Sequence, residues 1–171
     1  MYYTKVHIDN LEQLQQSILD KLPPEALTTH GVLPMWSQQL MQFDEIKNII
    51  QELGLESTAY CVCIVTMQPW SEFPVHIDSG KSQAALNIPL ANCNNTFTHW
   101  YQSTQPLIEY QHHGDGKYLG ADKNLCTRVA SLEMTEPHFI NIGALHNVDN
   151  PNNSWRILLS IRLTDYNFNS Q

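Results

Sequence analysis

The pattern of hydrophobic and polar positions changes at Gly54. Before it, apolar residues recur every three or four positions over 10–22 and 37–53, as in helices with one apolar face. Pro23-Pro24 would end the first helix, and Gly54 the second. Asp9 or Asn10 is a natural N-cap for the first helix. We expect the two helices to cover one face of a sheet.

After Gly54 the apolar runs shorten, become rich in β-branched and aromatic residues, and are separated by turns. Asn-rich segments at 92–95 and 150–153 are typical of tight turns between paired strands, and 111–116 predicts a polar loop. Evenly spaced short strands favour a barrel or jelly roll. The expected strands are 58–67, 75–78, 83–89, 96–102, 107–110, 128–134, 138–142 and 155–164.

Length and composition agree with one globular domain of 171 residues, with 1–54 as a helical cover and 55–171 as a jelly-roll core. The formal net charge is −8 with nine Lys and Arg together, which disfavours a nucleic-acid partner. The sequence shows no membrane-spanning stretch and no signal-peptide pattern at its start, so we expect a cytoplasmic protein without a membrane partner. The four cysteines lack a zinc-type spacing, which favours buried thiols.

Two His-x-Asp triplets are candidates for metal binding. His7-Ile8-Asp9 immediately precedes the first helix, where a capping role is the better interpretation. His76-Ile77-Asp78 instead lies in a β-patterned region. Residues i and i+2 of an extended segment point to the same face, so His76 and Asp78 can reach one metal ion.

A second segment offers another imidazole and a guanidinium. A predicted strand runs into His146, turn-type residues follow, and Arg156 comes ten positions later within an apolar run. Two histidines and one carboxylate on one face of an octahedron are typical of non-haem Fe(II) sites. Positions 156, 158, 160 and 162 share one strand face, which is either exposed to solvent or the interior of a ligand-binding barrel.

The sequence resembles the 2-oxoglutarate and Fe(II)-dependent oxygenases in the identity, order and spacing of four residues: His76, Asp78, His146 and Arg156. The segment ALHNVDNPNNSWRILLSIRL is most similar to the aspartyl/asparaginyl β-hydroxylase and prolyl-hydroxylase-like branches. Two departures stand out. Leu158 occupies a position where the family often has Ser or Thr, and Asp78 is present where the β-hydroxylase branch commonly lacks the carboxylate.

The resemblance implies a double-stranded β-helix, a cupin-like jelly roll, with His76, Asp78 and His146 as both metal ligands and catalytic centre. It also implies that Arg156 pairs with the distal carboxylate of 2-oxoglutarate. Asn87, a polar residue within an apolar strand, and Ser160, the hydroxyl nearest to Arg156 along its strand, are further candidates for contacting this cosubstrate.

The expected function is therefore a dioxygenase that uses Fe(II) and 2-oxoglutarate to hydroxylate a small molecule or a peptide side chain, with release of succinate and CO2. Because Asp78 fills the carboxylate position, hydroxylation is favoured over halogenation. One alternative is a non-catalytic cupin-like module that binds a metal or small molecule, because a fold does not fix a function. Another is a jelly-roll isomerase or a dioxygenase without cosubstrate, for which Arg156 would be replaceable. The oligomeric state is not predicted.

Overall fold

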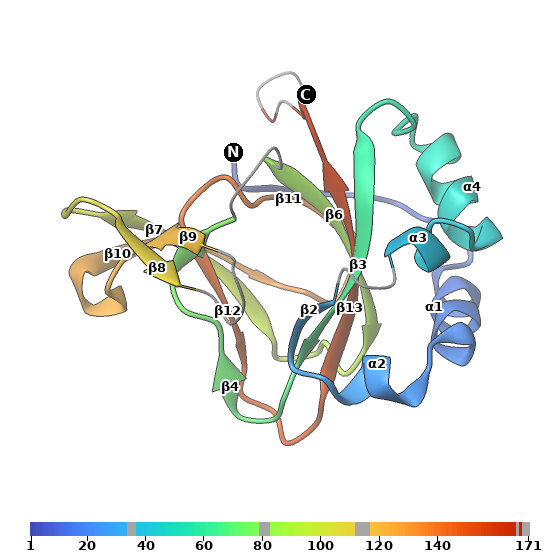
Figure 1. Cartoon of the computed structure of the whole chain (residues 1–171), viewed down its shortest axis with the longest axis horizontal. Helices are drawn as coiled ribbons and strands as arrows, with labels where there is room; N and C mark the ends of the chain where they lie inside the picture. The colour runs from blue at the N-terminus through green and yellow to red at the C-terminus, as the bar shows by residue number, and fades with distance from the viewer. Residues whose placement is uncertain (34–36, 79–82, 112–116, 167, 169–171) are drawn as a thin grey trace.

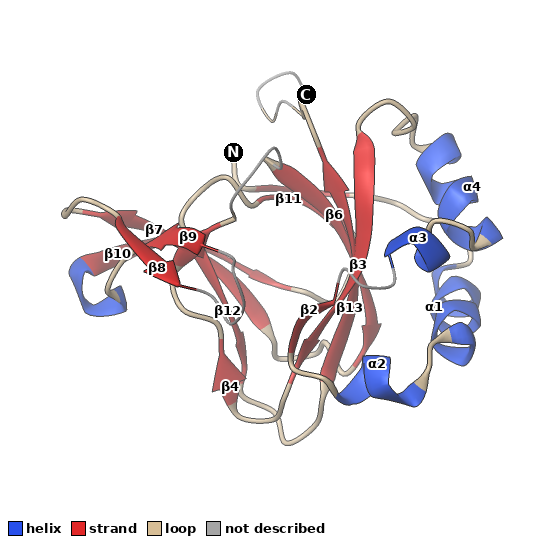
Figure 2. Cartoon of the chain, in the orientation of Figure 1, coloured by secondary structure: helices blue, strands red, loops and turns tan. Residues whose placement is uncertain are grey.

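The computed structural model describes the whole chain except residues 34–36, 79–82, 112–116, 167 and 169–171. Within the described residues, two antiparallel sheets face each other, and helices lie against one of them (Figures 1 and 2). This arrangement confirms the predicted fold class, a mainly β, cupin-like jelly roll with helices near the N-terminus. None of the helices in the described part of the chain is long and apolar enough to cross a membrane.

The sheet under the helices, called sheet A, has the strand order β1-β11-β6-β13-β3-β2. Its strands are β1 (Tyr3–Lys5), β11 (His138–Asn141), β6 (Ala84–Ala91), β13 (Arg156–Leu163), β3 (Ala59–Met67) and β2 (Gly31–Leu33). The opposite sheet, called sheet B, has the order β10-β7-β12-β5-β9-β8, with β4 paired to β12. Its strands are β10 (Cys126–Glu133), β7 (Phe97–Ser103), β12 (His146–Asn150), β5 (His76–Ile77), β9 (Lys117–Gly120), β8 (Ile108–Gln111) and β4 (Ser71–Glu72).

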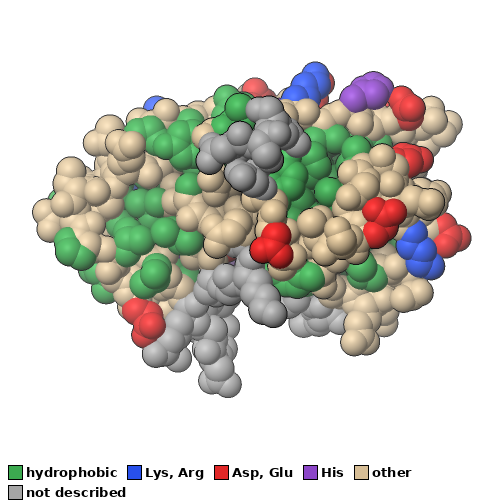
Figure 3. Space-filling model, turned by 90° about the horizontal axis from the view of Figure 1, so that it is seen from above, with side chains coloured by type: hydrophobic (Ala, Val, Ile, Leu, Met, Phe, Trp, Pro, Cys, Tyr) green, Lys and Arg blue, Asp and Glu red, His purple; other side chains and the backbone are tan. Residues whose placement is uncertain are grey.

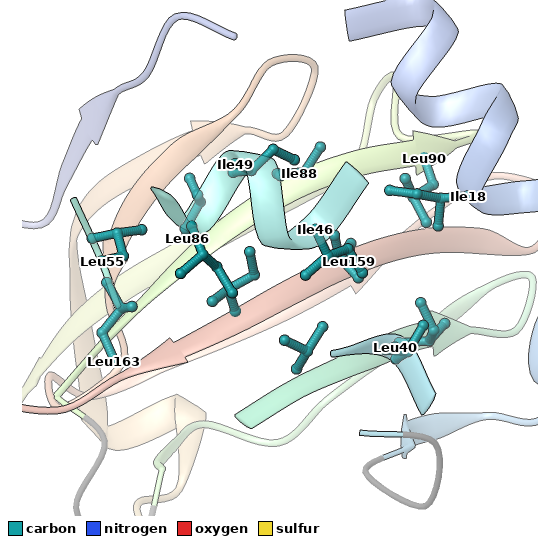
Figure 4. Packing of buried hydrophobic residues seen from close by; sticks show 14 of the residues in the cluster. Ile18, Leu40, Ile46, Ile49, Leu55, Leu86, Ile88, Leu90, Leu159 and Leu163 are labelled. Atoms are coloured by element: carbon teal, nitrogen blue, oxygen red, sulfur yellow. The ribbon is translucent and has the colours of Figure 1, made fainter. Parts of the chain in front are cut away.

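Among the described residues, two hydrophobic cores separate these layers, and a third, smaller cluster includes Val75, Tyr101, Ala121 and Leu145. The larger core lies between the outer face of sheet A and the helices α1 (Leu11–Lys21), α2 (Pro24–Thr28), α3 (Ser37–Leu40) and α4 (Asp44–Glu52). Figure 4 shows Ile18 of α1 beside Leu90 of sheet A, and Ile46 and Ile49 of α4 beside Leu159 and Ile88 of the same sheet. The helices therefore cover one sheet face, as the apolar stripe predicts. The second core fills the space between the sheets and includes Cys63, Val65, Ala85, Trp100, Leu132, Ile140 and Leu158.

The helical segment 37–53 is not continuous, contrary to the prediction. Gln42 N and Phe43 N bond to carbonyls three residues earlier, which ends α3, and Phe43 then adopts an extended conformation. A new helix begins with Asp44 and Glu45 in its first turn, where acidic side chains complement the helix dipole. Asn10 occupies the N-cap position of α1, but its side chain makes no capping hydrogen bond.

Three further expectations about local structure were wrong. The turn-rich residues after His146 form strand β12, which pairs with β7, β5 and β4. The predicted turns at 92–95 and 150–153 connect strands of different sheets, not paired strands. Strands β1 and β2, which were not predicted, join sheet A from within the N-terminal third. Most of the predicted polar loop 111–116 lies outside the described residues.

Candidate metal centre

The two histidines of the candidate site are direct neighbours in sheet B. His76 on β5 pairs with His146, the first residue of β12, and the two ring centroids lie 4.6 Å apart. Residues directly opposite on paired strands project to the same face. His146 also pairs with Trp100, which is buried between the sheets, so both imidazoles face the space between sheets A and B.

Asp78 completes the group two positions after His76. Its backbone N–H donates to the carbonyl of Ile142 at 3.1 Å, and its Oδ1 lies 3.0 Å from His76 Nε2. One donor atom each from His76, Asp78 and His146 lies within 4.8 Å of the others. The structure thus brings together the three residues that the sequence marks as metal ligands.

Both imidazoles are oriented by the same local hydrogen bond. His76 Nδ1 lies 2.7 Å from the carbonyl of Pro74, and His146 Nδ1 lies 2.9 Å from the carbonyl of Ala144. A carbonyl oxygen can only accept, so each Nδ1 donates, and in the neutral form of each ring Nε2 carries the lone pair. Such bonds fix the tautomer and ring orientation of histidines that bind metals.

The electrostatics favour a neutral His146 beside an ionised Asp78. Burial, together with the positive charge of His76, lowers the pKa of His146 to about 4. Burial alone would raise the pKa of Asp78, but the charge of Arg162 and the hydrogen bond with His76 hold it well below its usual range. At neutral pH the site therefore offers an imidazole lone pair and a carboxylate.

Arg162 is a site residue that was not selected from the sequence. It projects from β13 of sheet A across to sheet B, where its Nη1 forms an ion pair with Asp78 Oδ2. Asp78 Oδ1 is the oxygen that faces His76. The arginine thus engages one carboxylate oxygen and leaves the other directed toward the histidines.

The donor set fits a divalent transition metal. Imidazole suits iron, zinc, copper and nickel, and a carboxylate supplies a harder ligand and a negative charge. Donor atoms about 2.1 Å from one ion lie at most about 4.2 Å apart, so modest side-chain rotations would bring these three onto a single ion.

Arg156 does not contact the three candidate ligands. It lies six positions before Arg162 on the same strand face, about 20 Å away along the strand. Its side chain is 1% exposed, and its Nε donates to Thr96 Oγ1 at 3.2 Å. Within the described part of the chain, no carboxylate forms an ion pair with Arg156. Burial lowers its pKa, as expected for a guanidinium removed from water.

Asn87 and Ser160 are direct neighbours between Arg162 and Arg156. They pair across β6 and β13, and both are buried. Ala85 and Leu158, which share their strand faces, belong to the core between the sheets, so this face is the barrel interior and not a solvent surface. Asn87 Oδ1 and Thr98 Oγ1 are buried without a hydrogen-bond partner among the described residues.

The sequence contained a signal for Arg162, because Arg162 shares one strand face with Arg156 and Ser160. That signal could not separate a solvent surface from an interior. A second neighbour of the site, Tyr118, lies just after the predicted loop 111–116, where no strand was predicted. Its ring is edge-on to His76, with centroids 5.5 Å apart. The strand β9 that carries it is too short to show a pattern.

No protein-family model matches this chain, and no curated protein sequence matches it significantly. The solved structure of EvdMO1 aligns with 97% of this chain and 48% of its own length, with a TM-score of 0.56 and 12% identity. AviO1 from Streptomyces viridochromogenes Tue57 aligns with 96% of this chain and 90% of its own length, with a TM-score of 0.53 and 13% identity. A viral collagen prolyl hydroxylase from Paramecium bursaria Chlorella virus-1, solved with 2OG, aligns over 95% and 96% of the two chains, with a TM-score of 0.49 and 12% identity. At these identities, the likeness to EvdMO1 and AviO1 shows a shared fold.

Proposed function

We propose that the protein is a non-haem Fe(II) and 2-oxoglutarate-dependent dioxygenase that hydroxylates a small molecule or a peptide side chain. The observation that carries this proposal is the convergence of His76, Asp78 and His146, with donor atoms within 4.8 Å, between the sheets of a jelly roll. When bound, iron and 2-oxoglutarate would supply the oxidising chemistry, with succinate and CO2 as coproducts.

The protein's contribution begins with a preorganised ligand face. Two imidazoles and one carboxylate would occupy three positions around the metal and leave three for cosubstrate, oxygen and water. The Nδ1 bonds of His76 and His146 hold both rings, while Arg162 holds the carboxylate of Asp78. A site held in this way needs little reorganisation when the metal binds.

Arg156 remains the proposed partner of the distal carboxylate of 2-oxoglutarate. A buried guanidinium is costly unless an anion compensates it, and a carboxylate can accept two parallel hydrogen bonds from it. The cosubstrate would lie along the inner face of β13, past Ser160 and Asn87. The unpaired Oδ1 of Asn87 marks a polar position on that face.

Ligand-dependent unfolding tests this proposal without a known prime substrate. We expect 2-oxoglutarate to stabilise the protein only when Mn(II), a redox-stable substitute for Fe(II), is present. At 100 times its Kd, the added stability would be about 2.7 kcal/mol. The Arg156→Met variant would keep the stabilisation by Mn(II) and lose most of that by 2-oxoglutarate.

The controls use the two other arginines. Arg128 is exposed on β10, and Arg128→Met should respond to both ligands as the natural chain does. If Arg162→Met, and not Arg156→Met, loses the response to 2-oxoglutarate, then Arg162 is the cosubstrate arginine. Equal stabilisation by 2-oxoglutarate with and without Mn(II) would contradict chelation at the metal.

A further inference from the structure

The outer face of sheet B carries a serine, a histidine and an aspartate in hydrogen-bond contact. Ser131 on β10 pairs with His99 on β7, and Ser131 Oγ lies 2.7 Å from His99 Nδ1. On the other side of the ring, His99 Nε2 lies 3.3 Å from Asp149 Oδ2 of β12. Trp100, the next residue of β7, is buried between the sheets, so His99 projects to the opposite, outer face. This cluster is therefore separate from the candidate metal centre.

The chemistry of the three side chains sets the direction of both hydrogen bonds. An ionised carboxylate can only accept, so His99 donates from Nε2 to Asp149. In the neutral ring, Nδ1 then carries the lone pair and accepts from the hydroxyl of Ser131. A hydroxyl that donates to an imidazole whose other nitrogen is held by a carboxylate is the arrangement that activates a serine nucleophile. In this cluster Nδ1, and not Nε2, is the nitrogen beside the serine.

The base is held in place while the hydroxyl is open to solvent. Phe97 stacks on the ring of His99, with centroids 5.6 Å apart and planes 7° apart. The backbone N–H of Phe97 donates to Asp149 Oδ1 at 3.0 Å, which orients the carboxylate. The side chain of His99 is 9% exposed, whereas Ser131 is an exposed residue. A substrate can therefore reach the serine while packing keeps the imidazole in position.

The backbone of β10 offers a donor for the negative charge that develops on an attacked carbonyl oxygen. The N–H of Tyr101 donates to the carbonyl of Leu145, next to β12, so His99, two positions earlier, also directs its backbone groups to that side. Its partner Ser131 then directs its own N–H away from β7. Because β10 is the last strand of sheet B, this N–H lies at an open edge. An outward N–H beside the nucleophilic oxygen is placed as an oxyanion donor.

The surroundings of the cluster favour a small, neutral substrate. In Figure 3, hydrophobic side chains gather at the end of the molecule that carries β7 and β10, while most charged side chains of that view lie toward the helices. One backbone donor at an open edge stabilises an oxyanion less than a closed pocket with several donors would. An ester needs less of this help than an amide, because an alcohol leaves more readily than an amine.

We propose that Ser131, His99 and Asp149 form a second active site, which hydrolyses small neutral esters through an acyl-serine intermediate. Ser131 Oγ attacks the carbonyl carbon of the ester while its proton moves to His99 Nδ1. The bond between that carbon and the alcohol oxygen then breaks, and the alcohol leaves with the proton. Water, deprotonated by the same nitrogen, cleaves the acyl–Oγ bond and releases the acid and the free serine. The reaction needs neither a metal nor 2-oxoglutarate, so it is independent of the proposed dioxygenase function.

Covalent labelling of the full chain with diisopropyl fluorophosphate tests this site. The reagent transfers its phosphoryl group to an activated serine with loss of fluoride, and tandem mass spectrometry locates the label. We expect a label at Ser131, formed at the same rate with and without EDTA. His99→Gln and Asp149→Asn should each slow the labelling about 100-fold or more. Ser103→Ala is the matched control, because the hydroxyl of Ser103, on the same sheet, donates to the carbonyl of Gln105 and not to a histidine.

Hydrolysis of p-nitrophenyl acetate completes the test, and we expect Ser131→Ala to lose it while Ser103→Ala retains it. The proposal is overturned if Ser131 takes no label, or if folded His99→Gln is labelled as fast as the natural chain. Circular dichroism checks the fold of each variant, and if His99→Gln does not fold, Asp149→Asn decides in the same way. Hydrolysis that is unchanged in Ser131→Ala, or that EDTA abolishes, also overturns the proposal, because another group or a bound metal would then be responsible.

Discussion

At the scale of the residue, the site depends on contacts between side chains that are distant in the sequence. The His-x-Asp pattern and the distal histidine predict the three candidate ligands, because strand geometry places His76 and Asp78 on one face. The partner of Asp78 could not be predicted in the same way. Arg162 lies 84 positions away and on the other sheet, so only the packing of sheet A against sheet B brings it there.

Replacing Arg162 should destabilise the metal-free protein. Asp78 would lose its cationic partner in a largely buried position, and we expect Arg162→Met to lower the free energy of unfolding by about 2–4 kcal/mol. A divalent metal can supply the missing positive charge, so saturating Zn(II) should restore part of this loss. Urea unfolding with and without Zn(II) measures both effects, with Arg128→Met as the exposed control. An equal loss with and without Zn(II) would contradict the pairing of Arg162 with the metal site.

Two glycines provide a matched test of packing next to the site. In Gly120→Ala the new Cβ meets the backbone oxygen of Val75 at 2.5 Å, and backbone cannot move aside at low cost. In Gly143→Ala it meets the end of the exposed Gln83 side chain, which can rotate away. We expect Gly120→Ala to cost about 1–3 kcal/mol of unfolding free energy and Gly143→Ala clearly less. Equal costs in thermal unfolding would show that the strands beside His76 are less closely packed than described.

At the scale of the element, helices α1 and α4 are joined by a polar contact at the edge of the larger core. Glu45 of α4 accepts hydrogen bonds from Ser17 and Lys21 of α1. The hydrogen bond with Lys21, followed by that with Ser17, lowers the pKa of Glu45 to about 2 from an ordinary value of 4.5. The ionised form of Glu45 is therefore favoured in the folded protein.

This contact should make stability depend on acid pH. Because the folded pKa is lower than the unfolded one, the contribution of Glu45 is fully present above about pH 4.5 and is lost as pH falls toward 2. The side chains of Glu45 and Lys21 are both partly exposed. We therefore expect Glu45→Gln to lower the free energy of unfolding by only about 1 kcal/mol at pH 7. The difference from the natural chain should vanish near pH 2. Denaturant unfolding measures the free energy of unfolding of Glu45→Gln and of the natural chain at each pH. A difference between them that stays constant across this pH range would rule out an electrostatic origin.

Element boundaries were predictable where pattern and tertiary packing agree. Strands β3, β6 and β13 are largely buried apolar runs, and they form close to their predicted limits. Strand β12 has the sequence HNVDN, whose residues favour turns when taken alone. It becomes a strand because β7, β5 and β4 satisfy its backbone hydrogen bonds, which no local pattern can show.

At the scale of the whole molecule, short evenly spaced strands predict a barrel or jelly roll, and the structure has that architecture. The sequence could not assign strands to sheets. The segments 92–95 and 150–153 look like hairpin turns, but each carries the chain from one sheet to the other. The crossing at 150–153 leaves His146 on sheet B and Arg162 on sheet A, so the two segments of the candidate site face each other across the interior.

The central claim is that this interior holds iron and a 2-oxo acid. The most direct measurement is an anaerobic titration with Fe(II) and then 2-oxoglutarate, following the visible charge-transfer band of a chelated 2-oxo acid. We predict a band that is lost in His146→Ala and retained in His7→Ala, the exposed histidine of the other His-x-Asp triplet. Iron binding without any band would contradict the cosubstrate, and an unchanged band in His146→Ala would contradict the site itself.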